Sequence, residues 1–74
     1  TLKAYPNPVQ DILTLVQEEA LPSVITLYDI TGKVVHVEFS SQKETKIDLA
    51  HLAKGQYTLH VSNEKTQATQ LIIK

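Results

Sequence analysis

Short runs of apolar residues that recur at every second position constrain the fold of this chain more than any other feature. Residues 56–61 show the pattern clearly, because Tyr57, Leu59 and Val61 alternate with polar residues. Such alternation is typical of a β-strand with one face on a core and the other in water. We expect strands over residues 12–16, 24–28, 34–39, 45–49, 56–61 and 68–73.

The run over residues 34–39 also predicts a buried face. Successive side chains of a strand point to opposite faces of the sheet. Val35, Val37 and Phe39 therefore share one face, which we expect to lie on the core. His36, on the opposite face, is expected to point away from the core.

No part of the chain shows the helical period with capping residues at both ends. The nearest segment, residues 48–54, is stopped by Gly55 and predicts one turn at most. Six to seven short strands separated by turn residues predict an all-β fold, an antiparallel β-sandwich with Greek-key connections. The 74 residues are enough for one small domain, residues 1–74, and the absence of methionine indicates that it was cut from a longer protein.

The first of the two glycines lies between two expected strands, in Asp29-Ile30-Thr31-Gly32-Lys33. This sequence suits a type I turn followed by a left-handed residue, and glycine takes that conformation without steric cost. Asp29 is expected to accept hydrogen bonds from the backbone N–H groups of Thr31 or Gly32. The carboxylate is thus explained as a turn residue, with a surface read by a partner as the alternative.

The second glycine lies in Leu52-Ala53-Lys54-Gly55-Gln56-Tyr57, which has the spacing of a tyrosine corner. In that device the tyrosine hydroxyl bonds to the backbone a few residues upstream and fixes a crossover between two sheets. Gly55 lets the chain turn, and Leu52 is expected to pack beneath the turn. Both glycines therefore mark turns of a Greek-key sandwich.

Composition excludes several classes of function. The net charge is −1, with both signs spread along the chain, so there is no basic surface for nucleic acid. No apolar run approaches the roughly 20 residues that cross a bilayer, and no signal peptide is visible. The chain has no cysteine, which excludes disulfides, thiol nucleophiles and cysteine metal ligands.

The chain also lacks the spacing of a catalytic or cofactor site. Its serines, for example Ser23, Ser40 and Ser62, lie outside any Gly-x-Ser-x-Gly elbow, and its glycines do not form a phosphate loop. A sugar-binding sandwich would present exposed aromatic residues, but Tyr28 and Tyr57 are explained as core or corner residues. The sequence therefore predicts a domain that is not an enzyme and holds no cofactor.

Histidine leaves one alternative open. His36 and His60 fall on the faces opposite the expected core faces, where they could be neighbours and form a weak metal site with Glu38. No third ligand has a recognisable spacing, so solvent-facing histidines are preferred and no metal is expected.

Four short motifs follow one another in a specific order along the chain. They are Ala4-Tyr5-Pro6-Asn7-Pro8, Leu27-Tyr28-Asp29-Ile30-Thr31-Gly32-Lys33-Val34-Val35, Ile47-Asp48-Leu49-Ala50-His51-Leu52-Ala53-Lys54-Gly55-Gln56-Tyr57 and Leu71-Ile72-Ile73-Lys74. Together these motifs closely resemble the type A C-terminal sorting domain of the type IX (Por) secretion system, over nearly the whole chain.

The resemblance implies an Ig-like sandwich that acts as a secretion signal rather than as an enzyme. Its cargo would pass through the periplasm of a Gram-negative bacterium and reach the cell surface or the medium. The implied partners are the type IX translocon, outer-membrane shuttle proteins and a sortase-like protease that usually removes the domain and anchors the cargo. A different class of function, an Ig- or fibronectin-like spacer or adhesion module, fits the composition equally well.

The family pattern falls on residues with two expected roles. Pro6 and Pro8 remove N–H donors from an entry strand and so discourage edge pairing. The residues assigned to motif and fold are Tyr5, Pro6, Asn7, Pro8, Asp29, Gly32, Gly55 and Tyr57. The candidates for contact with the translocon are Lys33, Lys54, Leu71, Ile72, Ile73 and Lys74.

The three lysines are candidates because the sequence shows no turn or core role for them. The apolar residues are candidates because residues 67–74 are expected to form a sheet edge that pairs with a partner strand through main-chain hydrogen bonds. The same edge is a candidate for pairing or strand exchange between two copies of the fragment.

Overall fold

Seven β-strands build the protein, and a computed structural model describes them over residues 2–74, without a helix in that range. Thr1, the first residue of the expected domain, lies outside the described residues. All six expected strands are present, and periodicity missed only the three-residue β1. The strands are β1 (Lys3–Tyr5), β2 (Ile12–Val16), β3 (Ser23–Asp29), β4 (Val34–Ser40), β5 (Glu44–Asp48), β6 (Gln56–Ser62) and β7 (Gln67–Ile73).

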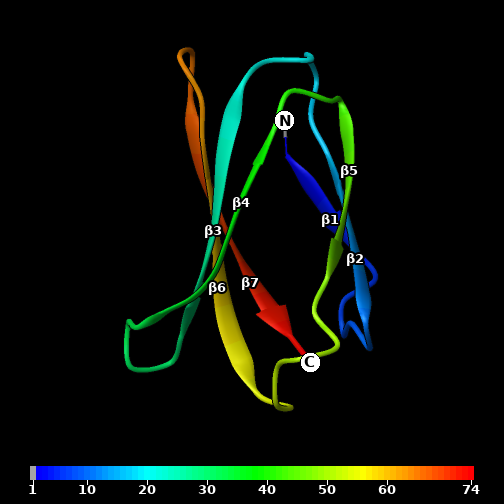
Figure 1. Ribbon diagram of the computed structural model, residues 1–74, viewed down its shortest axis with the longest axis vertical. Coiled ribbons are helices and arrows are strands. Elements are labelled where there is room, and N and C mark those ends of the chain that lie inside the picture. Colours follow the sequence, from blue (N-terminus) through cyan, green and yellow to red (C-terminus); the bar gives the residue numbers. More distant parts are fainter. Residues whose placement is uncertain (1) are drawn as a thin grey trace.

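The strands form two antiparallel sheets that face each other (Figure 1). One sheet has the order β1-β2-β5 and the other β4-β3-β6-β7. The chain crosses between the sheets after β2, β4 and β5, whereas hairpins join β3 to β4 and β6 to β7. This arrangement confirms the prediction of an Ig-like antiparallel sandwich.

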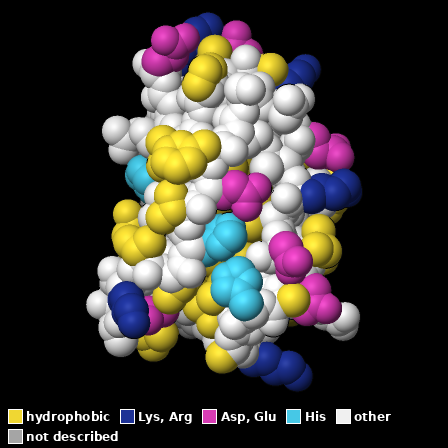
Figure 2. All heavy atoms as spheres, in the orientation of Figure 1, with side chains coloured by type: hydrophobic (Ala, Val, Ile, Leu, Met, Phe, Trp, Pro, Cys, Tyr) yellow, Lys and Arg dark blue, Asp and Glu magenta, His cyan; other side chains and the backbone are white. Residues whose placement is uncertain are grey.

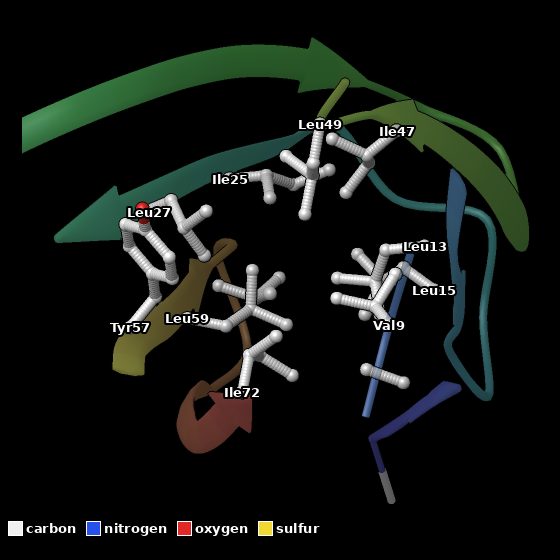
Figure 3. Packing of buried hydrophobic residues seen from close by; sticks show 12 residues of the cluster. Val9, Leu13, Leu15, Ile25, Leu27, Ile47, Leu49, Tyr57, Leu59 and Ile72 are labelled. Carbon is white, nitrogen blue, oxygen red and sulfur yellow. The ribbon is translucent and has the colours of Figure 1, made fainter. Parts of the chain in front are cut away.

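The core lies between the two sheets (Figure 3). Leu13 and Leu15 of β2 point from one sheet toward Ile25, Leu59 and Ile72 of the other. Buried residues alternate with more exposed ones along β3 and β6, because the other sheet covers only one face of their sheet. The buried apolar residues are Ala4, Val9, Leu13, Leu15, Ile25, Leu27, Ile47, Leu49, Tyr57, Leu59, Val61 and Ile72.

Strand β4 departs from the expected pattern. Val35 packs against the core, as expected, but Val37 and Phe39 point to the outer face of the sheet, and Phe39 is 74 % exposed. The cause is a bulge, because the pairing register shifts between Leu27 and Tyr28 and one extra residue of β4 reverses the alternation. The expected buried face of β4 is therefore wrong beyond Val35.

Candidate functional site

Motifs that are far apart in the sequence meet at one end of the sandwich, at the bottom of Figure 1. The segment between β1 and β2 touches the end of β7, since the N–H of Val9 donates to the carbonyl of Ile73 at 2.7 Å. Gly55, just before β6, exchanges two main-chain hydrogen bonds of 2.8 and 3.1 Å with Lys74. The end of β7 thus joins the segment that follows the Tyr-Pro-Asn-Pro motif to the glycine of the tyrosine corner.

Asn7 fastens the Tyr-Pro-Asn-Pro motif to the edge of β7. Its side-chain Nδ2 donates to the carbonyl of Leu71 and its Oδ1 accepts from the N–H of Ile73, both at 3.0 Å. The amide therefore substitutes for a neighbouring strand, and the prolines on either side of it offer no N–H group to pair. Both peptide bonds that precede Pro6 and Pro8 are cis.

The contact with Asn7 bears on the expectation that β7 pairs with a partner strand through main-chain hydrogen bonds. β7 is an edge of its sheet, as expected, but the main-chain groups of Ile73 and the carbonyl of Leu71 already bond to Asn7 and Val9. The Ile72 side chain is fully buried in the core. Leu71 and Ile73 keep exposed side chains, so the end of β7 offers a partner these side chains rather than free main-chain groups.

Lys74 has a structural contact that the sequence did not indicate. Its ammonium group donates to the carbonyls of Leu49 at 2.8 Å and Leu52 at 2.5 Å. These carbonyls belong to the turn between β5 and β6, so Lys74 joins the end of the chain to the tyrosine corner. The expectation that Lys74 has no turn role is wrong, because sequence spacing does not show which distant carbonyls a flexible side chain reaches.

The other two candidate lysines are exposed. Lys54 lines a hollow of about 500 Å³ at the motif end of the sandwich, together with Pro8, Val9 and Lys74. Lys33 follows the turn between β3 and β4. Both side chains are accessible to a partner.

Asp29 organises the turn between β3 and β4. One oxygen of its carboxylate accepts from the N–H of Thr31 at 2.9 Å, the hydroxyl of Thr31 at 2.6 Å and the N–H of Lys33 at 3.0 Å. These bonds, the Thr31 hydroxyl first, lower the pKa of Asp29. The prediction of a turn aspartate is confirmed, with Lys33 rather than Gly32 as the second main-chain donor.

The tyrosine corner is also confirmed. The hydroxyl of Tyr57 donates to the carbonyl of Ala53 at 2.5 Å, and Leu52 packs against the core beneath the turn. Tyr57 lies near the start of β6, where the chain enters the four-stranded sheet. Its ring is buried, so Tyr57 serves the fold rather than a partner.

The two glycines differ in what they require of the backbone, and this gives a first prediction. Gly32 has φ of +88°, whereas Gly55 lies outside the left-handed region, and a Cβ would find open space at either position. We expect Gly32→Ala to lower the free energy of unfolding by about 1–2 kcal/mol through backbone strain alone. The matched variant Gly55→Ala should change it by less than about 0.5 kcal/mol. Urea denaturation of both variants measures the difference, and equal losses would contradict this account of the turn.

The pairing register of the sheet contradicts the alternative of a metal site that contains both His36 and His60. His60 lies opposite Thr26 on the outer face, whereas His36 lies opposite the buried Leu27 on the inner face. His36 instead contacts Glu38 at 3.0 Å, and its ring centroid lies 5.4 Å from that of His51. Within residues 2–74 no group of three or more His, Cys, Asp or Glu side chains could hold a metal ion.

Fold and motif contacts together define a small Ig-like sandwich whose characteristic residues hold turns and strand ends in place. A family model described as the secretion system C-terminal sorting domain matches residues 3–74. The chain belongs to this family, the C-terminal sorting domains of the type IX secretion system. A comparison with curated protein sequences found no match.

Membership of this family defines the general function of the chain. The chain carries a type IX sorting signal, which implies interaction with that secretion system and export to the cell surface or the medium. Sorting domains of this kind are in general non-catalytic. Among the described residues no helix is long and apolar enough to cross a membrane.

Proposed function

We propose that this domain is the folded address of a longer protein, and that it directs the cargo on its N-terminal side from the periplasm through the type IX translocon. Shuttle proteins of the outer membrane then receive it, and a sortase-like protease removes it and anchors the cargo to the cell surface. The observation that carries the proposal is the family match over residues 3–74, which spans the whole sandwich from β1 to β7.

The proposed contact with the translocon uses exposed groups that the fold does not need. Lys33 and Lys54 fulfil this condition, as do the outer side chains of Leu71 and Ile73. Ile72 and Lys74 support that surface from behind, since one is buried and the other bonds to a neighbouring turn. A folded surface suits a system with many cargoes, because its shape does not depend on what precedes it.

A fusion experiment tests this function. A reporter carrying an inner-membrane export signal is placed before residues 1–74 and expressed in a host with a type IX system. We expect the reporter at the cell surface, and in the periplasm of a matched strain that lacks the translocon. The double variant Lys33→Glu/Lys54→Glu should fold normally, because both side chains are exposed, but should reach the surface in smaller amounts.

The fusion also separates this proposal from the spacer alternative. An Ig-like spacer or adhesion module would leave the reporter in the periplasm of both strains. That result would overturn the proposed function.

A further inference from the structure

The four edge strands of the two sheets are protected to different degrees. An unprotected edge presents free N–H and C=O groups that pair with other chains, so proteins shorten, charge or cover such edges. β1 has only three residues, and β5 exposes the charged side chains of Glu44, Lys46 and Asp48. β7 is covered along its last residues by Asn7 and Val9. β4 is the remaining edge.

Main-chain groups of β4 point away from its sheet. Gly55 and Lys74 exchange two main-chain hydrogen bonds. In an antiparallel sheet, every second residue of a strand directs its N–H and C=O groups to the neighbour on one side, and the residues between direct theirs to the other side. The pairing registers of β7 with β6, β6 with β3 and β3 with β4 then direct the N–H and C=O groups of His36 and Glu38 toward β3, and those of Val37 and Phe39 outward. Within residues 2–74, β4 pairs only with β3, so these outward groups have no strand to bond.

The outer face beside this edge is apolar. Val37 is 48 % and Phe39 is 74 % exposed, and Val24 of β3 lies directly opposite Phe39. Figure 2 shows hydrophobic side chains in a band along this side of the molecule, over the path that β4 takes in Figure 1. None of the three residues carries a charge that would discourage edge pairing.

The sequence of β4 is complementary to itself when it is reversed about Val37. In an antiparallel pair with Val37 opposite Val37 on the outer face, His36 lies opposite Glu38 on the inner face. His36 and Glu38 already contact each other within one chain, at 3.0 Å on the inner face. A second copy would therefore bring a Glu38 opposite His36 and a His36 opposite Glu38, which adds two polar pairs.

We propose that β4 is a homodimerisation edge. Two copies pair their β4 strands antiparallel about a two-fold axis at Val37, and the two four-stranded sheets become one continuous eight-stranded sheet. The two Val37 residues exchange main-chain hydrogen bonds, and the apolar bands of the two copies adjoin on the outer face. The contact is isologous, so it closes at two copies and does not propagate.

Charged substitutions at the two-fold axis test this pairing. Opposed side chains in an antiparallel pair have Cβ atoms about 4.5–5.5 Å apart, and like charges there are destabilising. We expect the 74-residue chain to dimerise in sedimentation equilibrium, and Val37→Lys or Val37→Glu to raise the dimer dissociation constant roughly tenfold or more. An equimolar mixture of the two variants should recover dimers, because Lys then faces Glu.

Leu71→Lys is the matched control, because Leu71 is 49 % exposed on the outer face of the other edge of the same sheet. It should leave the dimer intact, and circular dichroism should show that all three variants are folded. A wild-type chain that stays monomeric at millimolar concentration would overturn the proposal, as would a mixture of Lys and Glu variants that stays monomeric. If Val37→Lys instead blocks export of a monomeric wild-type fusion, the edge serves a strand of the export machinery and not a second copy.

The dimer does not rest on the proposed export function. Sedimentation uses the isolated chain, whereas export is measured in cells. Either proposal can therefore fail while the other stands.

Discussion

Replacement of Leu13 by alanine is expected to lower the free energy of unfolding by about 2–5 kcal/mol. Leu13 has no exposed surface, and it lies on β2 facing the residues of the opposite sheet (Figure 3). A chain this small rarely gains more than about 3–5 kcal/mol from its core. We therefore expect Leu13→Ala to be largely unfolded at 25 °C, which urea denaturation followed by circular dichroism measures.

The neighbouring residue provides the control. Ile12 is 45 % exposed on the opposite face of β2, so Ile12→Ala removes the same kind of side chain without opening a cavity. Ile12→Ala should lower the free energy of unfolding by less than about 1 kcal/mol. Similar losses for the two variants would show that the space between the sheets is not the source of stability.

The second large effect is expected at Lys74. Lys74→Met keeps an unbranched side chain but removes the two hydrogen bonds that the ammonium group donates to the carbonyls of Leu49 and Leu52. A hydrogen bond that involves a charged group contributes about 1.5–3 kcal/mol to stability. Lys74 is partly exposed to water, which weakens both bonds, so we expect Lys74→Met to lower the free energy of unfolding by an amount within that range. Thermal denaturation of the variant measures the loss.

Lys33→Met is the matched control for this substitution. Lys33 is exposed, and its replacement should change stability by less than about 0.5 kcal/mol. The two lysines would then be separated by their roles, with Lys74 stabilising the tyrosine corner and Lys33 free for a partner. A Lys74→Met variant as stable as the Lys33→Met variant would contradict the structural role of Lys74.

Local sequence patterns predicted the parts of the fold that depend on neighbouring residues. Alternation located six strands, and glycine and aspartate located the turn at Asp29 to Gly32 because turn geometry is decided within four or five residues. The tyrosine corner was predictable for the same reason, since Tyr57 bonds to Ala53 only four positions upstream.

The remaining features depend on contacts that spacing does not encode. Asn7 bonds to Leu71 and Ile73, which are 64 and 66 positions away, and only the folded chain shows that its amide covers the edge of β7. The exposed position of Phe39 follows from a bulge, which depends on how β3 and β4 pair and not on the letters of β4 alone. In the sequence, the only indication of this role was that Asn7 is a polar residue between two prolines.

These contacts give a physical reason why several sequence motifs occur together in one sorting domain. The Tyr-Pro-Asn-Pro segment, the tyrosine corner and the terminal lysine all bond to one another or to β7 at one end of the sandwich. Each motif therefore depends on the others for its geometry. The surface that they build exists only in the folded chain.

The most direct test of this account is the fraction of reporter at the cell surface for fusions to the wild-type domain and to the Leu13→Asp variant. Leu13→Asp leaves every exposed candidate residue in the sequence but places a carboxylate in the core, so the domain should not fold. We predict surface reporter for the wild-type fusion and periplasmic reporter for Leu13→Asp, at equal expression. Equal export of the two fusions would contradict the account, because the secretion system would then read a linear segment rather than the surface of a folded sandwich.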